Sequence, residues 1–206
     1  MMYDLHDVSF SYPQGRNVFT GLNLELSRKE NVIICGDNGS GKSTLLKLLA
    51  GILSPSSGSI TGSGMQQKSK TPGQGVFYLS QEPREQLLGF TPENDLRIWN
   101  IASINTQVIL DHPLLTEAPD DFLNYPFREL SSGMLQAYFL ALALMASDRY
   151  LLLDEPLKSL DQGRREIFIQ SLGTRKGMVV VSHEPALFTS LACRHLEIRE
   201  GQLYEI

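Results

Sequence analysis

The chain has 206 residues, of which 42% are hydrophobic, which is enough for one α/β domain with a substantial core. Its formal net charge is −5, and this mild acidity argues against nucleic-acid binding, which needs a basic face. The two cysteines, Cys35 and Cys193, are too few for a disulfide framework or a cysteine-rich metal site, so we expect free thiols.

The first part of the chain predicts three strands and a helix. Residues 3–12 and 22–27 alternate apolar and polar side chains, as half-buried strands do. The apolar run over 31–35 predicts a buried strand, and residues 42–50 predict the helix that follows it. Residues 54–75 are rich in Gly, Ser, Pro and Gln, which favours a surface loop or hairpin.

The rest of the chain predicts strands that alternate with helices. Residues 92–128 are loosely helical and interrupted by three prolines, so we expect a small, mostly helical insert there. The other predicted elements are strands at 76–80, 150–154 and 178–182, helices at 132–147, 161–172 and 185–192, and a closing hairpin of strands 195–199 and 202–206. This alternation predicts a mostly parallel sheet covered by helices on both faces.

A glycine-rich segment between the predicted strand 31–35 and the helix 42–50 matches the phosphate-binding pattern G-x-x-x-x-G-K-[ST]. Its glycines allow a tight turn that brings backbone N–H groups and a helix N-terminus against phosphate oxygens. Lys42 adds a charge at the β and γ phosphates, Ser43 a hydroxyl for Mg²⁺, and Thr44 a phosphate contact. The candidate nucleotide-binding residues of this loop are Gly36, Asn38, Gly39, Ser40, Gly41, Lys42, Ser43 and Thr44.

Polar residues also follow three later predicted strands. Asp154 and Glu155 end the strand 150–154, where Asp154 can hold Mg²⁺ and Glu155 can activate a water for attack on the γ-phosphate. Gln81 follows 76–80 and can contact Mg²⁺ or that water, and His183 follows 178–182 and can orient it. Because carboxyl ends of parallel strands share one edge, we expect these residues to converge.

These motifs resemble, in content and order, the ATP-binding cassette (ABC) ATPase family over nearly the whole chain. Beyond the phosphate-binding loop, Gln81 is similar to the family's Q-loop residue, 130–136 to its signature motif, 159–161 to its D-loop and His183 to its switch histidine. The resemblance implies a P-loop NTPase fold: a mostly parallel sheet flanked by helices, an antiparallel β subdomain and a small α-helical subdomain. It implies one domain over 1–206, with a core of about 1–82 and 129–206 and a helical subdomain of about 83–128.

The resemblance also implies ATP and Mg²⁺ as ligands and a second ABC ATPase, identical or paralogous, as a partner. Tyr12 stands where the family places an aromatic residue that stacks on adenine. Ser131 and Gly133 would contact the γ-phosphate bound to the partner chain. From the residues alone, Ser131 could equally be a helix N-cap. Ser132 and Met134 depart from the family's usual glycine and glutamine, which bears on the strength of this contact.

Residues 81–96 are similar to the Q-loop region of energy-coupling-factor ATPases, which drive uptake of vitamins or metal ions. That resemblance implies two membrane partners, a transmembrane coupling subunit and a substrate-binding subunit. We expect a groove within 83–128 for a coupling helix, with Leu87, Leu88, Phe90 and Trp99 as candidate contacts.

Two other hypotheses remain, a soluble ABC ATPase outside transport and a P-loop kinase of a small metabolite. Neither a signal peptide nor an apolar run of about 20 residues is visible, so we expect a cytoplasmic protein held at the membrane by its partners. We also expect a monomer or weak dimer without nucleotide.

Overall fold

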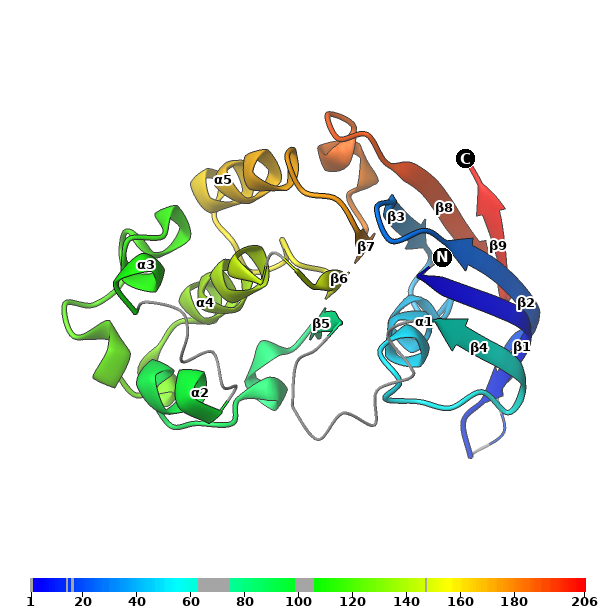
Figure 1. The fold of residues 1–206 in the computed structure, drawn as a ribbon, viewed down its shortest axis with the longest axis horizontal. Coiled ribbons are helices and arrows are strands. Elements are labelled where there is room, and N and C mark those ends of the chain that lie inside the picture. The colour runs from blue at the N-terminus through cyan, green and yellow to red at the C-terminus, as the bar shows by residue number, and fades with distance from the viewer. Residues whose placement is uncertain (1, 14, 16, 63–74, 99–105, 147) are drawn as a thin grey trace.

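Nine strands form two sheets in the computed structural model, which describes residues 2–13, 15, 17–62, 75–98, 106–146 and 148–206. The strands are β1 (Tyr3–Ser11), β2 (Asn17–Leu26), β3 (Asn31–Gly36), β4 (Ser57–Gly62), β5 (Val76–Leu79), β6 (Tyr150–Asp154), β7 (Met178–Val181), β8 (Arg194–Arg199) and β9 (Gln202–Glu205). One sheet has the order β5-β6-β7-β3-β8-β9, and the other the order β2-β1-β4 (Figure 1).

The six-stranded sheet is parallel except at one edge. Strands β5, β6, β7, β3 and β8 pair in parallel, and β9 returns antiparallel to β8. The three-stranded sheet is antiparallel throughout. The predicted mostly parallel sheet and closing hairpin are therefore confirmed.

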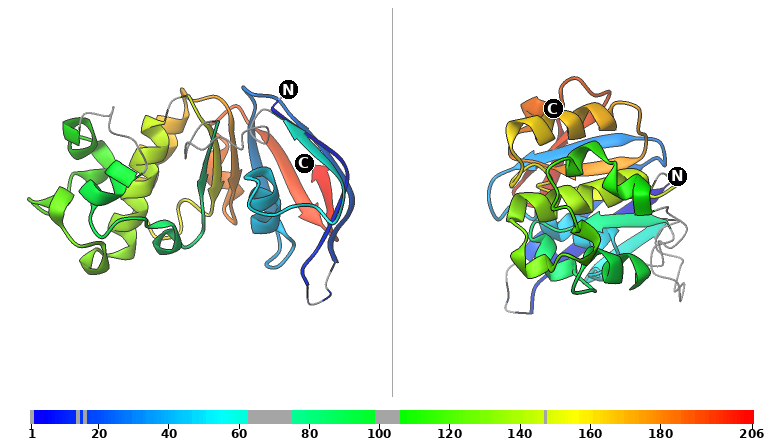
Figure 2. Two further views of the ribbon diagram at one scale, coloured as in Figure 1. Left: turned by 60° about the horizontal axis from the view of Figure 1, so that its bottom comes forward. Right: turned by 90° about the vertical axis from the view of Figure 1, so that its left-hand side faces the viewer.

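The parallel strands bury both faces, because successive side chains point to opposite sides. Ile33, Leu151 and Val180 contribute to the same core cluster as α4 (Ser132–Met145) and α5 (Gln162–Leu172). Val32 and Leu152 face the other way, toward α1 (Lys42–Leu49) and the three-stranded sheet. The sheet thus lies between two helices on one side and a helix with a β layer on the other (Figure 2).

Short helices fill the region between β5 and α4. They are η1 (Pro83–Gln86), α2 (Pro92–Ile98), α3 (Thr106–Leu110), η2 (Pro113–Leu115), η3 (Phe122–Asn124) and η4 (Phe127–Glu129). Pro83, Pro92 and Pro113 each occupy the first position of one of these helices, where the missing backbone donor costs no hydrogen bond. The helices pack on α4, which is buried from Met134 to Ala143 and sits between them and the sheet.

Three sequence expectations need correction. The second strand begins at Asn17, ahead of the predicted start, because Val18 and Phe19 extend its pairing with β1. Within 54–75, residues 57–62 form β4, which pairs with β1, while 63–74 lie outside the described residues. The helix expected over 185–192 is only a 3-10 turn, η5 (Pro185–Phe188), which already buries Phe188 completely.

Candidate functional site

The glycine-rich loop joins β3 to α1 at the carboxyl edge of the parallel sheet. Gly36, Gly39 and Gly41 have φ angles of 140°, 77° and 108°, a region that side chains rarely adopt. A Cβ on Gly36 would lie 2.6 Å from the carbonyl oxygen of Ile198, and one on Gly41 would lie 2.6 Å from Val18. At Gly39 a Cβ would meet nothing within 4 Å, so this side of the loop faces open space.

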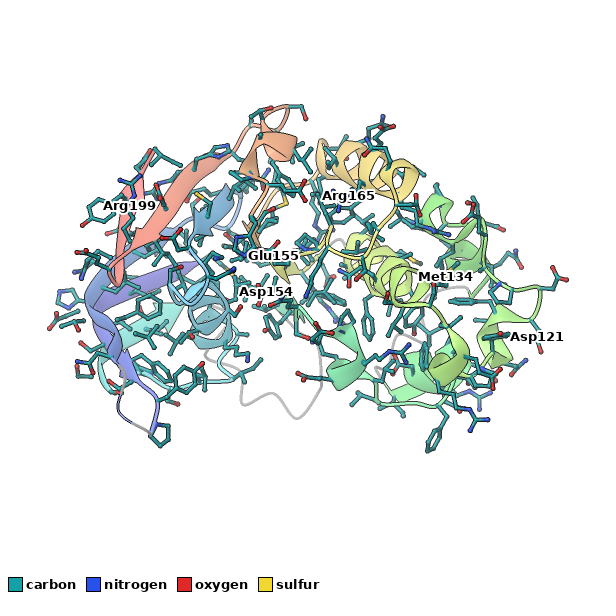
Figure 3. All side chains as sticks on the ribbon, turned by 180° about the vertical axis from the view of Figure 1, so that it is seen from behind. Asp121, Met134, Asp154, Glu155, Arg165 and Arg199 are labelled. Carbon is teal, nitrogen blue, oxygen red and sulfur yellow. The ribbon has the colours of Figure 1, made fainter. Side chains whose placement is uncertain are left out.

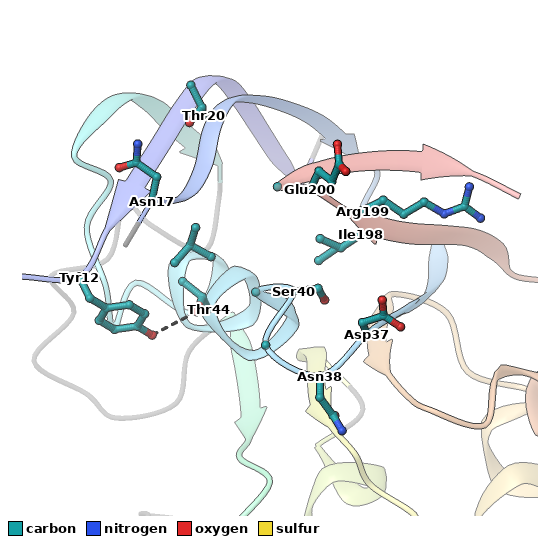
Figure 4. A pocket seen from close by; sticks show the side chains of 14 residues that line it. Tyr12, Asn17, Thr20, Asp37, Asn38, Ser40, Thr44, Ile198, Arg199 and Glu200 are labelled. Atoms are coloured by element: carbon teal, nitrogen blue, oxygen red, sulfur yellow. Dashed lines mark hydrogen bonds between the residues drawn. The ribbon is translucent and has the colours of Figure 1, made fainter. Parts of the chain in front are cut away.

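That open space is a cavity of about 900 Å³ beside the loop (Figure 4). Its walls come from the loop, from α1, from the segment after β1, from β2 and from the β8–β9 hairpin. The lining residues are Tyr12, Asn17, Val18, Thr20, Asp37, Asn38, Gly39, Ser40, Gly41, Thr44, Ile198, Arg199, Glu200 and Gly201. The structure therefore gathers Tyr12 with five of the predicted loop residues around one space large enough for a nucleotide.

Tyr12 lies at one wall of this cavity, just beyond the end of β1. Its hydroxyl is 3.1 Å from Oγ1 of Thr44, and its ring makes an edge contact with Phe10 at a centroid distance of 5.0 Å. The side chain remains 41% exposed. The ring is thus fixed by two contacts while still accessible to a planar ligand.

Lys42 begins α1 and is almost fully buried beneath the loop. Its Nζ donates to the carbonyl oxygens of Gly36 at 2.7 Å and Asp37 at 2.9 Å. Burial lowers the pKa of Lys42, and the nearby carboxylates of Glu155 and Asp154 oppose that lowering. Because an ammonium has three donors, one remains for a phosphate oxygen.

Asp154 ends β6 and is only 2% exposed. Its Oδ1 is buried and accepts no hydrogen bond within the part of the chain that the structure describes. Burial raises its pKa, which a hydrogen bond from Ser43 and the charges of Lys47 and Lys42 counteract. A buried oxygen without a donor beside a serine hydroxyl fits a divalent cation, since Mg²⁺ prefers a few protein oxygens together with phosphates.

Glu155 and His183 follow neighbouring strands, β6 and β7, and contact each other. The backbone N–H of His183 donates to Glu155 Oε2 at 3.3 Å, and Nε2 lies 3.3 Å from Oε1 at ion-pair distance. Burial raises the pKa of Glu155, while the adjacent imidazole lowers it. Figure 3 shows Glu155 beside Asp154 near the centre of the molecule, so the strand ends bring these groups together as the sequence predicts.

Three other candidate residues make no hydrogen bond or ion pair with Asp154, Glu155 or His183 among the described residues. Gln81 follows β5 and is exposed, and no contact of its side chain within the described ranges fixes its position. Ser131 caps α4 by accepting a hydrogen bond from the N–H of Met134 at 3.1 Å. A Cβ on Gly133 would lie 2.7 Å from the carbonyl oxygen of Ser159. Ser131 and Gly133 thus belong to the helix on the opposite face of the sheet from α1.

Sequence reasoning missed the far wall of the cavity. Asn17 and Thr20 line it from β2, and Arg199 and Glu200 from the β8–β9 hairpin. These residues match no motif, and the sequence predicted the hairpin only as the end of the fold. The buried Gln136, which donates to the carbonyl oxygen of Pro156 at 2.9 Å, was likewise assigned no contact.

A parallel sheet with a phosphate-binding loop after β3 and acidic residues after β6 defines a P-loop nucleotide-binding protein. A family profile described as ABC transporter matches residues 19–158, and the chain belongs to this family. It is an ABC-type ATPase, the ATP-hydrolysing class of subunit found in transporters.

Sequence comparison with individual proteins supports this assignment. The chain is 33% identical to a Methanosarcina acetivorans protein described as "Putative ABC transporter ATP-binding protein", over 97% of its own length and 75% of that protein. It is 33% identical to the energy-coupling factor transporter ATP-binding protein EcfA1 of Thermotoga maritima, covering 89% and 73% of the two chains.

Solved structures share the fold. A dimeric bacterial ABC transporter cassette superposes with a TM-score of 0.82 at 23% identity, covering 100% of this chain and 98% of that chain. A second structure, a dimeric cassette in a post-hydrolysis state bound to ADP and Pi, gives a TM-score of 0.81 at 21% identity over the same shares. At this identity the likeness establishes the P-loop NTPase fold of the ABC cassettes.

Proposed function

We propose that the chain powers an energy-coupling-factor-type transporter that imports a vitamin or a metal ion. The observation that carries this proposal is the resemblance of residues 81–96 to the Q-loop region of such ATPases. Two EcfA1 proteins, from Thermotoga maritima and Mycoplasmoides gallisepticum, are 33% and 31% identical to the chain, which supports it. Among the described residues, none of the helices combines the length and the hydrophobicity that a membrane span requires.

A groove of about 400 Å³ is the candidate docking site for the coupling subunit. It lies between η1 and η4, and its lining residues are Arg84, Leu87, Gly89, Phe90, Thr91, Pro126, Phe127 and Arg128. Phe90 is 89% exposed and Leu88 51%, whereas Leu87 packs partly against the core. Trp99, also a candidate contact, lies outside the described residues. A short amphipathic helix could cover the two exposed apolar side chains.

The loop that carries Phe90 is held firmly from beneath. The carboxylate of Asp95, which is fully buried, accepts hydrogen bonds from the N–H groups of Leu88 at 2.8 Å and Gly89 at 3.1 Å. Its other oxygen accepts from the hydroxyl of Tyr138 on α4 at 3.2 Å. A partner that presses on this loop would therefore act on the helix that begins with the signature residues.

In the proposed reaction, each residue of the site has a defined role. Lys42 and the backbone N–H groups of its loop hold the phosphates, and Tyr12 stacks on the base. Ser43, Asp154 and Gln81 would hold Mg²⁺, which supplies positive charge against the phosphate oxygens. Glu155 accepts a proton from the attacking water.

Two further roles complete this proposal. His183 lies against the carboxylate of Glu155 and orients the same water. Ser131 and Gly133 would meet the γ-phosphate bound to a second cassette, as the family resemblance implies.

Hydrolysis is tested by Glu155→Gln, which keeps the shape of the side chain but removes its basic carboxylate. We expect turnover of Mg-ATP to fall at least about 100-fold while nucleotide affinity is retained. Turnover equal to that of the wild type, measured with the membrane partners present, would contradict the role of Glu155.

The transport assignment is tested by purifying tagged chain with the membrane proteins of its own cells. We expect a transmembrane coupling subunit and a small substrate-binding subunit to be identified by mass spectrometry, and Phe90→Ser to weaken their retention. Ile206→Ser serves as the control, because Ile206 is also exposed, at 61%, but lies at the C-terminus. Recovery only in a soluble complex that keeps ATPase activity would instead favour a non-transport ABC ATPase.

A further inference from the structure

Arg165 in the first turn of α5 joins two loops of the site that are distant in sequence. Its Nε donates to the carbonyl oxygen of Leu160 at 3.1 Å. Its Nη1 lies 3.2 and 3.4 Å from the two carboxylate oxygens of Glu184. The Arg165 side chain is 24% exposed, whereas that of Glu184 is 55% exposed. One planar group thus satisfies a carbonyl and a carboxylate at once.

The two loops are those that follow β6 and β7 and carry Glu155 and His183. Leu160 ends the loop after β6, and Glu184 directly follows His183. The loops therefore touch at two places: Glu155 against His183, and Arg165 between Leu160 and Glu184. In Figure 3, Arg165 lies on the α5 side of Glu155.

Both anchors of Arg165 are themselves fixed. Leu160 is buried, and its N–H donates to the carbonyl oxygen of Leu157 at 3.2 Å. The N–H of Glu184 donates to Oγ of Ser182 at 3.0 Å, and its carbonyl oxygen accepts from the N–H of Leu187. The ion pair between Arg165 and the Glu184 carboxylate therefore constrains the backbone next to His183.

We propose that Arg165 is a positioning residue for ATP hydrolysis, which holds the loop of His183 against the loop of Glu155 through its bond to Glu184. The proposal rests on the proposed catalytic roles of Glu155 and His183. The side chain of Arg165 binds Leu160 and Glu184 rather than Glu155 or His183 themselves, so its effect on the reaction passes through these two loops. A half-exposed ion pair of this kind contributes little to global stability, so the effect should appear in turnover.

The test compares Arg165→Gln, Glu184→Gln and the double variant in steady-state ATPase assays. We expect each single variant to lower kcat about tenfold, because small displacements of catalytic groups are costly. KM for ATP and nucleotide affinity should stay within about twofold. If the pair acts as a unit, the double variant loses no more than either single variant.

Arg194→Gln is the matched control. Arg194 on β8 also binds a carboxylate, Glu205 at 3.0 Å, and a carbonyl oxygen, that of Glu25 at 3.4 Å, but at the end of the strand away from the cavity. We expect its kcat to be unchanged. Arg165→Lys, which keeps the charge without the fork, should lie between wild type and Arg165→Gln.

Three results would overturn the proposal: an unchanged kcat in Arg165→Gln, losses that add in the double variant, or a loss confined to KM. Should Arg165→Gln fail to fold, Glu184→Gln decides alone, because its side chain is 55% exposed and its removal leaves the core intact. Full turnover in Glu155→Gln or His183→Ala would instead refute the proposed function, so the two failures are distinguishable.

Discussion

Tyr12 shows at the scale of a single residue how the ring and the hydroxyl of one side chain can be tested apart. Its hydroxyl lies against Thr44, while its ring lines the cavity. We expect Tyr12→Ala to weaken ATP binding by about 1 to 3 kcal/mol, roughly 5- to 150-fold, which is the usual contribution of a base stacked on an aromatic side chain. Tyr12→Phe should bind nearly as well as the wild type.

A fluorescent ATP analogue titrated into each variant measures this difference. Tyr204→Ala is the control, since Tyr204 is similarly exposed, at 48%, but lies on β9 and does not line the cavity. Equal losses in Tyr12→Ala and Tyr12→Phe would assign the contribution to the hydroxyl.

Lys42 marks the limit of what sequence reasoning can predict for one residue. The spacing of the motif identified Lys42 as a phosphate ligand, because that pattern requires a lysine there. The same spacing could not predict that its ammonium also holds the carbonyl oxygens of Gly36 and Asp37. These bonds depend on the fold of the loop, and no residue type encodes them.

At the scale of the element, alanine substitution of two glycines tests the contact between α4 and the loop after β6. Gly133 and Gly163 are each the second residue of a helix. A Cβ at Gly133 would lie 2.7 Å from the backbone oxygen of Ser159, whereas one at Gly163 would lie 3.4 Å from the side chain of Asp161. We expect Gly133→Ala to lower stability by about 1 to 3 kcal/mol, because α4 must move away from the loop.

Gly163→Ala should have the opposite sign, a gain of about 0.5 to 1 kcal/mol from the better helix former. Thermal and denaturant unfolding of both variants measures the difference. If Gly133→Ala is as stable as Gly163→Ala, the signature helix does not rest on the loop after β6.

The elements that the sequence predicted well are those with a strong local pattern. The buried strands 150–154 and 178–182 and the helix begun by Asp161 appear close to their expected bounds, with Asp161 accepting from the N–H of Arg164. The prediction of a helix over 185–192 was wrong, because a single turn already buries Phe188 before the chain enters β8. Tertiary packing rather than propensity set that boundary.

The whole molecule presents the start of α4 to solvent, which bears on how two copies would meet. Ser131 is exposed although it caps the helix. We expect the chain to be monomeric without nucleotide, and Glu155→Gln with ATP to shift to a dimer, because ATP that is bound but not hydrolysed would be shared between two chains. Adding Ser131→Arg should return this variant to a monomer without loss of ATP affinity.

Size-exclusion chromatography with light scattering follows this change, and Lys42→Ala, which removes a phosphate ligand, provides the nucleotide-free limit. A stable dimer without ATP, or a dimer that tolerates Ser131→Arg, would contradict the arrangement.

The sequence predicted the overall sheet from alternating strands and helices. The antiparallel β subdomain over α1 followed from the family resemblance and from the alternating patterns of 3–12 and 22–27. The pattern could not place β4 in it, because 54–75 carries little hydrophobic patterning and β4 is held mainly by pairing with β1.

The backbone of Glu155 has a φ angle of 49°, in the left-handed region that a glutamate seldom adopts. Burial raises the pKa of Glu155, and the neighbouring charge of Asp154 raises this pKa further. A glutamate at position 155 therefore lowers the stability of the folded protein, so activity and stability oppose each other at this position. Glu155→Asn should raise the melting temperature while abolishing turnover, since asparagine tolerates this conformation and carries no charge.

A second variant separates the contribution of the backbone conformation from that of the carboxylate. Glu200 in the β8–β9 hairpin has a similar φ angle, 50°. Glu200→Asn relieves the backbone alone, so any larger gain in Glu155→Asn measures the relief of the carboxylate. A chain selected only for heat resistance would thus be expected to lose its acid at 155 first, and a thermostable variant of this protein needs its improvements placed elsewhere.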